Sequence, residues 1–258
     1  MTGIVLEVEG PVAILRLNRP EKLNALATEA IANLARCCAE IERMPGLRGV
    51  VLTGEGKAFC AGGDITSWGG LGATEFSRRW IRDGHDAFDA LARLRLPVIA
   101  VLNGHALGGG LELAACADYR IAEEHVKLGQ PETGLGMIPG WSGTQRAVRR
   151  FGQQVVRRMT IFGDVFPAAR ALDLGLVDQV VESGAGMKAA LQLAERVVAR
   201  GPRATELTKM LVNAAEGEER ERVLDVLASA AASDTPEVAE GTAAFREKRP
   251  AVFPGDEG

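Results

Sequence analysis

The sequence of 258 residues predicts an α/β fold from two patterns in its apolar residues. Short apolar runs alternate with longer segments whose apolar residues recur every three or four positions, which is typical of strands alternating with helices. The predicted strands are short and irregularly spaced along the chain. The spacing argues against a simple doubly wound sheet, so the α/β class is expected with another arrangement of its strands.

The first elements are a predicted hairpin and a helix. Two apolar runs at 4–8 and 12–17 are joined by Glu9-Gly10-Pro11, a sequence typical of a turn between two strands. Residues 24–44 predict a helix because their apolar positions share one helical face. These positions are Leu26, Ile31, Leu34, Cys38 and Ile41.

The middle of the chain predicts two buried strands separated by loops and a polar helix. Residues 49–53 form a short apolar run that stops at Gly54, and the stretches at 54–57 and 61–64 are loop-like. The polar, arginine-rich segment 66–96 is expected to be helical from about Thr74. The run at 97–102 is a second buried strand, broken by Asn103-Gly104.

The following region predicts a helix opened by glycines. That helix starts near Gly109 and runs toward Cys116, with a strand expected at 119–122. Residues 131–143 are rich in glycine and proline and are expected to be mostly loop. Helices are then predicted at 145–151, 153–162 and 167–174.

The last third of the chain predicts a change to all-helical structure. A strand through Val181 and a helix around 187–198 come first, and Gly201-Pro202 then interrupts the pattern. Beyond it, helices are expected at 204–215, 218–232 and 236–248. We therefore expect a core at 1–200 and a C-terminal helical module at 201–258.

The composition excludes several classes of function. A net charge of −4 gives no electrostatic basis for nucleic-acid binding, and no apolar run approaches the ~20 residues of a membrane span. Cys37, Cys38, Cys60 and Cys116 contain no C-x-x-C pair, so neither a zinc site nor a disulfide framework is expected. No metal site and a cytoplasmic, reducing location are the resulting expectations, consistent with the lack of a signal-peptide pattern.

Three familiar glycine motifs fail on single residues. Ala58 follows Gly56-Lys57 where a P-loop needs Ser or Thr, and Pro139 stands where the third glycine of G-x-G-x-x-G would follow Gly134. Thr144 stands where the last glycine of a nucleophile elbow would follow Ser142, and no histidine lies downstream as a base. Nucleotide binding through these loops and serine hydrolysis are therefore not expected.

A triple glycine followed by two carboxylates is the strongest chemical signal. Glycines at 108–110 allow close backbone approach to a ligand, and Glu112 and Glu132 supply two acids for general acid–base work. Each acid has a simpler interpretation: Glu112 would complement the helix dipole, and Glu132 would be a solvated loop carboxylate. Asp64 would in the same way cap a helix that starts near Ile65.

Six segments, in chain order, resemble the enoyl-CoA hydratase/isomerase (crotonase) superfamily, and its hydratases in particular. The resemblance spans almost the whole chain. The segments are NRPEKLNAL at 18–26, GKAFCAGGDI at 56–65, PVIAVLNGHALGGG at 97–110, GQPE at 129–132, GTQR at 143–146 and EGTAAFREKR at 240–249.

The resemblance implies a fold, an assembly and a substrate class. It implies a crotonase-like spiral of ββα turns, with the C-terminal helical module making a homotrimer or a dimer of trimers. The substrate would be an acyl-CoA thioester, with no cofactor besides the coenzyme A that is part of it. The N–H groups of Ala61 and Gly109 would form the oxyanion hole, and Glu112 and Glu132 would match the two hydratase acids.

The same resemblance implies the residues that contact the substrate. Lys22 would lie near the CoA entrance, and Phe245 and Lys248 of a neighbouring subunit would contact the nucleotide, although Lys248 is equally a basic residue of a last helical turn. Trp141 stands where the family often has a small residue, and would either narrow the acyl pocket or pack outward into the core. The expected substrate-binding residues are Lys22, Ala25, Gly62, Gly63, Asp64, Ile65, Gly108, Pro131, Trp141, Phe245 and Lys248.

The implied reaction is hydration of a trans-2-enoyl-CoA to a 3-hydroxyacyl-CoA. Glu112 would act as the base for water and Glu132 would deliver a proton to the α-carbon. Retention of both acids favours a hydratase over its sister enzymes, namely isomerases, decarboxylases and CoA-ester hydrolases. A catalytically silent CoA- or RNA-binding member of the superfamily is the remaining alternative, against which the negative net charge argues.

Overall fold

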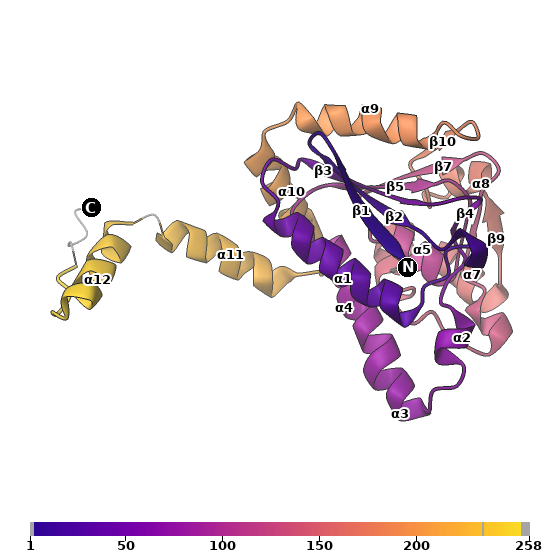
Figure 1. Cartoon of the computed structure of the whole chain (residues 1–258), viewed down its shortest axis with the longest axis horizontal. Helices are drawn as coiled ribbons and strands as arrows, with labels where there is room; N and C mark the ends of the chain where they lie inside the picture. The colour runs from indigo at the N-terminus through magenta and orange to yellow at the C-terminus, as the bar shows by residue number, and fades with distance from the viewer. Residues whose placement is uncertain (1–2, 234, 254–258) are drawn as a thin grey trace. The chain divides into compact units, whose positions relative to one another are not determined.

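A mixed sheet formed by strands between Ile4 and Val181 organises the core of the computed structural model, which describes residues 3–233 and 235–253 (Figure 1). Its first two strands pair antiparallel with Ile4 opposite Leu17, and every later pairing in the sheet is parallel. The α/β class and the predicted hairpin are therefore confirmed. In spatial order the strands are β1 (Ile4–Glu9), β2 (Val12–Leu17), β3 (Gly49–Gly54), β5 (Val98–Leu102), β7 (Tyr119–Glu123) and β10 (Gln179–Val181).

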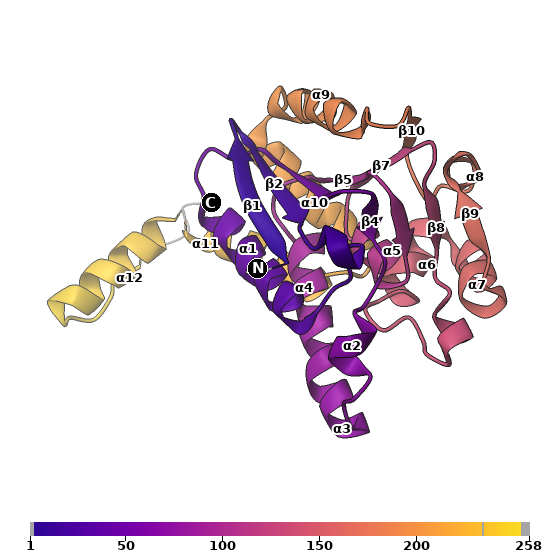
Figure 2. The same cartoon turned by 45° about the vertical axis from the view of Figure 1, so that its right-hand side comes forward.

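Helices cover both faces of this sheet (Figures 1 and 2). Helix α9 (Gly186–Val198) packs on β3, β5 and β7, where Ala190 and Ala194 meet Val51 and Val101. Helices α1 (Thr28–Arg43) and α4 (Arg82–Ala92) pack against each other on the opposite face. Burial on both faces explains why β3 and β5 are continuous apolar runs.

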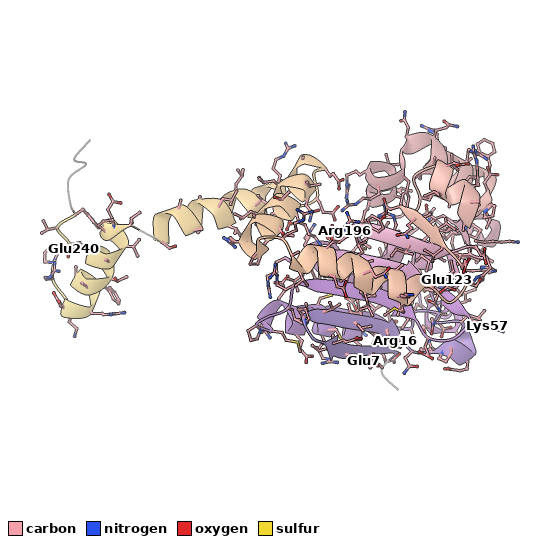
Figure 3. All side chains as sticks on the ribbon, turned by 90° about the horizontal axis from the view of Figure 1, so that it is seen from above. Glu7, Arg16, Lys57, Glu123, Arg196 and Glu240 are labelled. Carbon is pink, nitrogen blue, oxygen red and sulfur yellow. The ribbon has the colours of Figure 1, made fainter. Side chains whose placement is uncertain are left out.

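The outer strand of the hairpin is partly exposed, and its surface carries charged residues. Glu7 of β1 and Arg16 of β2 lie near each other on the outside (Figure 3), with 3.4 Å between Oε2 and a guanidinium nitrogen. Residues that lie diagonally across two paired strands are close enough to interact. This ion pair therefore lies on the face of the hairpin that is exposed to solvent.

A second, smaller sheet contains the strands that lead into the glycine-rich segments 61–64 and 108–110. Its strands are only three residues long, so no periodicity in the sequence predicts them. Strands β4, β6 and β8 are parallel, and β9 pairs antiparallel with β8. In spatial order they are β4 (Ala58–Cys60), β6 (His105–Leu107), β8 (Lys127–Gly129) and β9 (Val165–Pro167).

The first long helix begins four residues later than the sequence predicts. Leu23 and Asn24 both have left-handed backbone conformations, with φ of 52° and 56°. The buried Asn24 amide donates to the carbonyls of Glu55 and Ala58, at 2.9 and 2.7 Å. Asn24 therefore ties the loop before α1 to the segment that leads into β4.

Most of the remaining short helices of the core lie where the sequence predicts helices, and two 3₁₀ helices lie in segments where none was predicted. The segment before α4 is helical, as predicted, although it is divided into several pieces. One of them, η2, is a π-helix. The elements are η1 (Pro20–Lys22), α2 (Ile65–Trp68), α3 (Ala73–Glu75), η2 (Phe76–Ile81), α5 (Gly109–Ala114), η3 (Glu132–Leu135), α6 (Gln145–Phe151), α7 (Gln153–Phe162) and α8 (Ala168–Asp173).

The chain divides into two compact units, one ending at Lys209 and the other beginning at Met210. The division falls inside α10 (Pro202–Ala215), so the second unit begins nine residues after the position 201 expected from Gly201-Pro202. Lys209 explains the shift, because its buried ammonium group binds the Leu96 carbonyl at 2.9 Å and the Asp118 carboxylate at 2.7 Å. Residues 1–2 and 254–258, which the predicted modules include, lie outside the described residues.

The second unit is helical, as predicted, and contains α11 (Arg220–Ser233) and α12 (Pro236–Glu247). The Thr235 hydroxyl accepts the Val238 N–H and so caps α12. After the helix, Arg249 turns back and forms a bidentate ion pair with Glu240, at 2.6 and 2.9 Å. Among the described residues of both units, no helix has the length and apolar character needed to span a membrane.

Candidate active site

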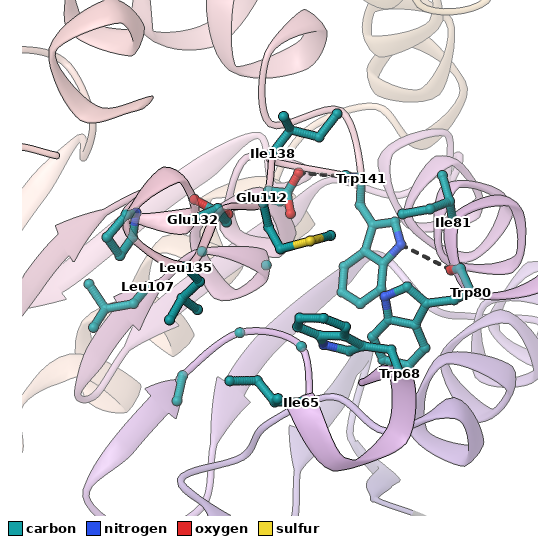
Figure 4. A pocket seen from close by; sticks show the side chains of 18 of the residues that line it. Ile65, Trp68, Trp80, Ile81, Leu107, Glu112, Glu132, Leu135, Ile138 and Trp141 are labelled. Carbon is teal, nitrogen blue, oxygen red and sulfur yellow. Dashed lines mark hydrogen bonds between the residues drawn. The ribbon is translucent and has the colours of Figure 1, made fainter. Parts of the chain in front are cut away.

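One cavity of about 450 Å³ brings together most of the residues that the sequence singles out (Figure 4). Its size is within the range of small-molecule sites. Four segments line it: the loop at 61–65, the helical region from Trp68 to Ile81, the turn into α5, and the loop around η3. Glu112 and Glu132 are the carboxylates among the lining residues.

The triple glycine shapes the turn from β6 into α5. Gly108 has φ 52° and ψ −127°, a backbone conformation that only glycine adopts readily. A Cβ on Gly110 would lie 2.2 Å from the Cys60 carbonyl oxygen, so the helix start packs directly on β4. Glycine is required here for backbone conformation and for close packing.

Glu112 is buried in α5 and is held by the backbone of the loop after η3. Its Oε1 atom accepts hydrogen bonds from the N–H groups of Trp141 and Gly143, both at 2.7 Å. Burial, together with the nearby Glu132 carboxylate, raises the pKa of Glu112 to about 8, despite these two donors and Arg146. The group is therefore an anchored carboxyl that can exchange a proton near neutral pH.

Glu132 faces the cavity from the first residue of η3. Neither carboxylate oxygen has a hydrogen-bond partner among the described residues, and burial raises its pKa to about 7. A Cβ on Gly108 would lie 3.1 Å from Oε1 of Glu132, so the glycine leaves room for the acid. An unpartnered buried carboxyl is suited to binding a ligand proton or a water molecule.

One of the two N–H groups predicted as oxyanion donors already has a partner within the chain. The Ala61 N–H donates to the Leu23 carbonyl at 3.0 Å, so it is already engaged within the chain. The N–H groups of Gly63 and Gly109 have no hydrogen-bond acceptor among the described residues. They belong to adjacent stretches of the lining, because a Cβ on Gly109 would lie 3.4 Å from the Gly63 nitrogen.

The side chain of Trp141 packs in the core and also forms part of the cavity wall. The sequence left these two positions as alternatives, and the side chain occupies both. It is 3% exposed and yet lines the cavity. Its indole N–H donates to the Trp80 carbonyl at 3.1 Å, and its ring packs on Trp80 and Phe88. A Cβ on Gly84 would lie 2.0 Å from the indole nitrogen, so the glycine of α4 provides the space for this ring.

Other predicted residues divide into cavity-lining and structural ones. Gly62, Ile65, Gly108 and Pro131 line the cavity as expected, although Gly62 and Gly108 do so with backbone at positive φ. Asp64 does not line it. Asp64 instead caps α2, and its Thr66 hydrogen bond and its 3.0 Å ion pair with Arg19 hold its pKa below the usual range.

The residues predicted for the CoA moiety lie outside the cavity lining. Lys22 is exposed at the end of η1, and Ala25 accepts a hydrogen bond from Arg19 at 2.7 Å. Phe245 and Lys248 belong to the second unit, where Phe245 is 85% exposed and Lys248 ends α12 in a left-handed conformation. Their expected contacts with CoA stay predictions.

Several lining or supporting residues carry no local signal in the sequence. Trp68, Trp80 and Ile81 line the cavity from a polar, arginine-rich stretch. Gly143 holds Glu112 with its N–H, and a Cβ there would lie 2.5 Å from Oε1 of that acid. The GTQR segment that begins at Gly143 is part of the family resemblance. That resemblance was the signal in the sequence that could have identified Gly143 as a supporting residue.

Comparison with known proteins agrees with this geometry. The enoyl-CoA hydratase/isomerase family model matches residues 7–256. A crotonyl-CoA hydratase from Syntrophomonas wolfei is 36% identical with 97% of each chain covered, and an (E)-benzylidenesuccinyl-CoA hydratase from Thauera aromatica is 35% identical with 98% and 99% covered. The crystal structure of an enoyl-CoA hydratase from Bacillus anthracis superposes with a TM-score of 0.80 at 33% identity, covering 98% of this chain and all (100%) of that one. The chain is therefore a member of the enoyl-CoA hydratase/isomerase family, with the crotonase fold.

Proposed function

We propose that the protein is an enoyl-CoA hydratase, a hydro-lyase that adds water to a trans-2-enoyl-CoA and gives a 3-hydroxyacyl-CoA. The presence of two buried carboxyls, Glu112 and Glu132, on one cavity carries this proposal. Water addition needs a base for the water and an acid for the α-carbon, and two such groups meet both needs. The hydratase names of the relatives agree with this choice.

The thioester oxygen would sit between the N–H groups of Gly63 and Gly109. Two backbone donors aimed at one oxygen stabilise the negative charge that develops there when the β-carbon is attacked. Gly63 replaces Ala61 in this role because the Ala61 N–H is already donated to Leu23. Removing one such donor in an enzyme typically costs about 10²–10³ in kcat.

The two carboxyls would share one proton near neutral pH, because burial raises both pKa values and the Glu132 carboxylate raises that of Glu112 further. We assign Glu112 as the base, since two N–H donors stabilise its ionised form. Glu132, which has no donor, would hold the proton and transfer it to the α-carbon. The pKa of about 8 for Glu112 and about 7 for Glu132 favours the reverse assignment, and the pH profiles of the two glutamine variants distinguish the two.

In the reaction, water would lie between the two carboxyls. Glu112 would take a proton from it as its oxygen bonds to the β-carbon, and the thioester would become an enolate held by Gly63 and Gly109. Glu132 would then protonate the α-carbon. Atoms balance as one enoyl thioester plus one water, and no oxidation occurs. The proposed steps use only the carboxyls, the two N–H groups and water.

The assembly and location expected from the family likeness are proposals of the same kind. We expect a homotrimer or a dimer of trimers in the cytoplasm. Light scattering on the purified protein tests the assembly, because a monomer of 27.3 kDa is well separated from three or six copies.

The reaction is tested by incubating the protein with crotonyl-CoA. Hydration removes the enoyl thioester absorbance, and the product gains the mass of one water. An isomerase would move a double bond without a mass change, and a hydrolase would release free CoA. Crotonyl-CoA has no carboxylate to lose, so a malonyl-type CoA ester is assayed beside it, from which a decarboxylase would release carbon dioxide. If crotonyl-CoA and longer enoyl-CoA esters are bound without any of these changes, the protein is a silent CoA-binding member of the family.

A further inference from the structure

The acyl group must be inferred from the cavity, because relatives of equal similarity carry names with different acyl groups. The chain has three tryptophans, and all of them line this one cavity: Trp68, Trp80 and Trp141. Phe76 joins them, with its ring edge-on to Trp68 at 5.8 Å. Figure 4 shows the three indoles gathered on the side of the cavity away from Glu132.

The three indoles meet next to the proposed oxyanion hole. A Cβ on Gly63 would lie 3.0 Å from Trp80, 3.4 Å from Trp68 and 3.5 Å from Trp141. The Gly63 N–H is one proposed donor to the thioester oxygen, and the β-carbon of an enoyl thioester is only a few bonds from that oxygen. The rings therefore lie close to whatever group the β-carbon carries, and not at the far end of a long chain.

Two of the three indoles, those of Trp80 and Trp141, are held rigidly. Trp141 and Trp80 are buried, their rings pack at 5.0 Å, and the Trp141 indole N–H is bonded to the Trp80 carbonyl. The space for Trp141 exists because residue 84 is glycine. A rigid aromatic wall favours a flat ligand that offers a ring face or edge, since such ring pairs contribute more than the area they bury.

The cavity also restricts which ring it would accept. Glu112 and Glu132 are the charged side chains of the lining, and both belong to the reaction. Beyond the indole N–H groups, the other lining side chains are apolar, among them Ile65, Ile81 and Ile138. A polar substituent on the ring would therefore lose its hydrogen bonds to water without gaining a dedicated partner.

We propose that the preferred substrate carries an unsubstituted aromatic ring on the β-carbon, an arylacryloyl-CoA such as cinnamoyl-CoA. This inference rests on the proposed hydratase function. Water would add its oxygen to the ring-bearing β-carbon and a proton to the α-carbon, giving a β-hydroxy-β-aryl thioester. Conjugation with the ring favours the enoyl side of this equilibrium, so the reverse reaction, loss of water, is the practical one to follow.

The experiment compares kcat/KM for dehydration of three thioesters by the whole protein. They are β-hydroxy-β-phenylpropanoyl-CoA, its β-cyclohexyl counterpart and β-hydroxybutanoyl-CoA. The cyclohexyl ester matches the phenyl ester in size but has no flat π-system. We expect the phenyl ester to exceed both others by about tenfold or more, the scale of one to two good ring–ring contacts.

Trp68→Leu tests the aromatic wall. The ratio of kcat/KM for the phenyl ester to kcat/KM for the cyclohexyl ester should fall several-fold toward one. Both rates come from the same preparation, so the ratio does not depend on the fraction of the variant that is folded. Phe162→Leu is the matched control, since Phe162 is 76% exposed on α7 and does not line the cavity. Its ratio should equal that of the wild type.

Two outcomes overturn the inference while leaving the hydratase intact. One is a phenyl ester used no better than the cyclohexyl or butanoyl ester. The other is a Trp68→Leu variant whose ratio stays at the wild-type value. If none of the three esters loses water and crotonyl-CoA is not hydrated either, the proposed reaction itself fails, and the aryl preference fails with it.

Discussion

The backbone N–H of Trp141 donates to Oε1 of Glu112 at 2.7 Å, while the indole of the same residue walls the cavity. One residue therefore positions a proposed catalytic carboxyl group and shapes the site for the acyl group. Any change that moves the Trp141 ring is expected to affect both functions together.

Gly84→Ala tests how tightly this ring is held. Alanine normally stabilises a helix interior by up to about 1 kcal/mol over glycine, but here its Cβ would lie 2.0 Å from the Trp141 indole nitrogen. We expect the free energy of unfolding to fall by about 1–3 kcal/mol, the usual cost of overpacking. Urea denaturation measures it.

A matched helix glycine and a double variant sharpen this test. Gly241 lies inside α12, and a Cβ there would make an ordinary 3.6 Å contact with Phe253, so Gly241→Ala should be neutral or stabilising. Adding Trp141→Leu to Gly84→Ala should cost less than the sum of the two single changes. If the two changes in the free energy of unfolding simply add, a Cβ at position 84 does not clash with the Trp141 ring.

Gly108→Ala should damage both the backbone and the acid beside it. The φ of 52° and ψ of −127° are costly for alanine, by about 1–3 kcal/mol, and its Cβ would lie 3.1 Å from the Glu132 carboxylate. We expect a lower melting temperature and a lower kcat. Gly201→Ala, at an ordinary φ with a 3.7 Å contact, is the control expected to change neither. A fully active Gly108→Ala enzyme would contradict the tight placement of Glu132.

The pH dependence of residual activity assigns the base and the acid. If Glu112 is the base, it must be ionised, so it causes the loss of activity on the acidic side of the profile. Glu112→Gln should then remove the acidic limb, and Glu132→Gln the alkaline limb. The opposite pattern would exchange the two roles, as the order of their pKa values favours.

The raised pKa of Glu112 also links stability to pH. Its folded value of about 8 lies above the ordinary 4.5, so the folded protein binds more protons than the unfolded chain between these values. The free energy of unfolding should therefore fall as the pH rises from about 5 to about 8, by up to about 1.4 kcal/mol per unit. Denaturation of wild type and Glu112→Gln at both pH values checks this. An equally steep fall in the variant would exclude Glu112 as the source.

The sequence could predict the long elements because their periodicity is local. The hairpin, α1 and the buried strands β3 and β5 are examples, and both acids were identified from a triple glycine and a glycine-rich loop. The strands of the small sheet were missed because three residues contain no detectable period. The start of α1 was misplaced because the left-handed turn at Leu23 and Asn24 depends on hydrogen bonds to residues 31 and 34 positions away.

The details of the site depend on contacts between distant segments, which no local pattern encodes. Ala61 and Gly63 are two residues apart, and only the bond from Ala61 to Leu23 distinguishes them as donors. The wall formed by Trp141 depends on a glycine 57 positions earlier in the chain, in α4. The sequence therefore singled out the two acids, and the structure was needed to show which N–H groups are already bonded and which residues form the cavity wall.

The most direct test of the two-carboxyl proposal is the rate of crotonyl-CoA hydration by Glu112→Gln and by Glu132→Gln. Each change keeps the size of the side chain and removes its ability to exchange a proton, so kcat should fall by about 10²–10⁴ in each variant. Glu29→Gln, on the exposed face of α1, should keep the wild-type rate. If both active-site variants hydrate crotonyl-CoA at the wild-type rate, these two carboxyls do not perform the reaction.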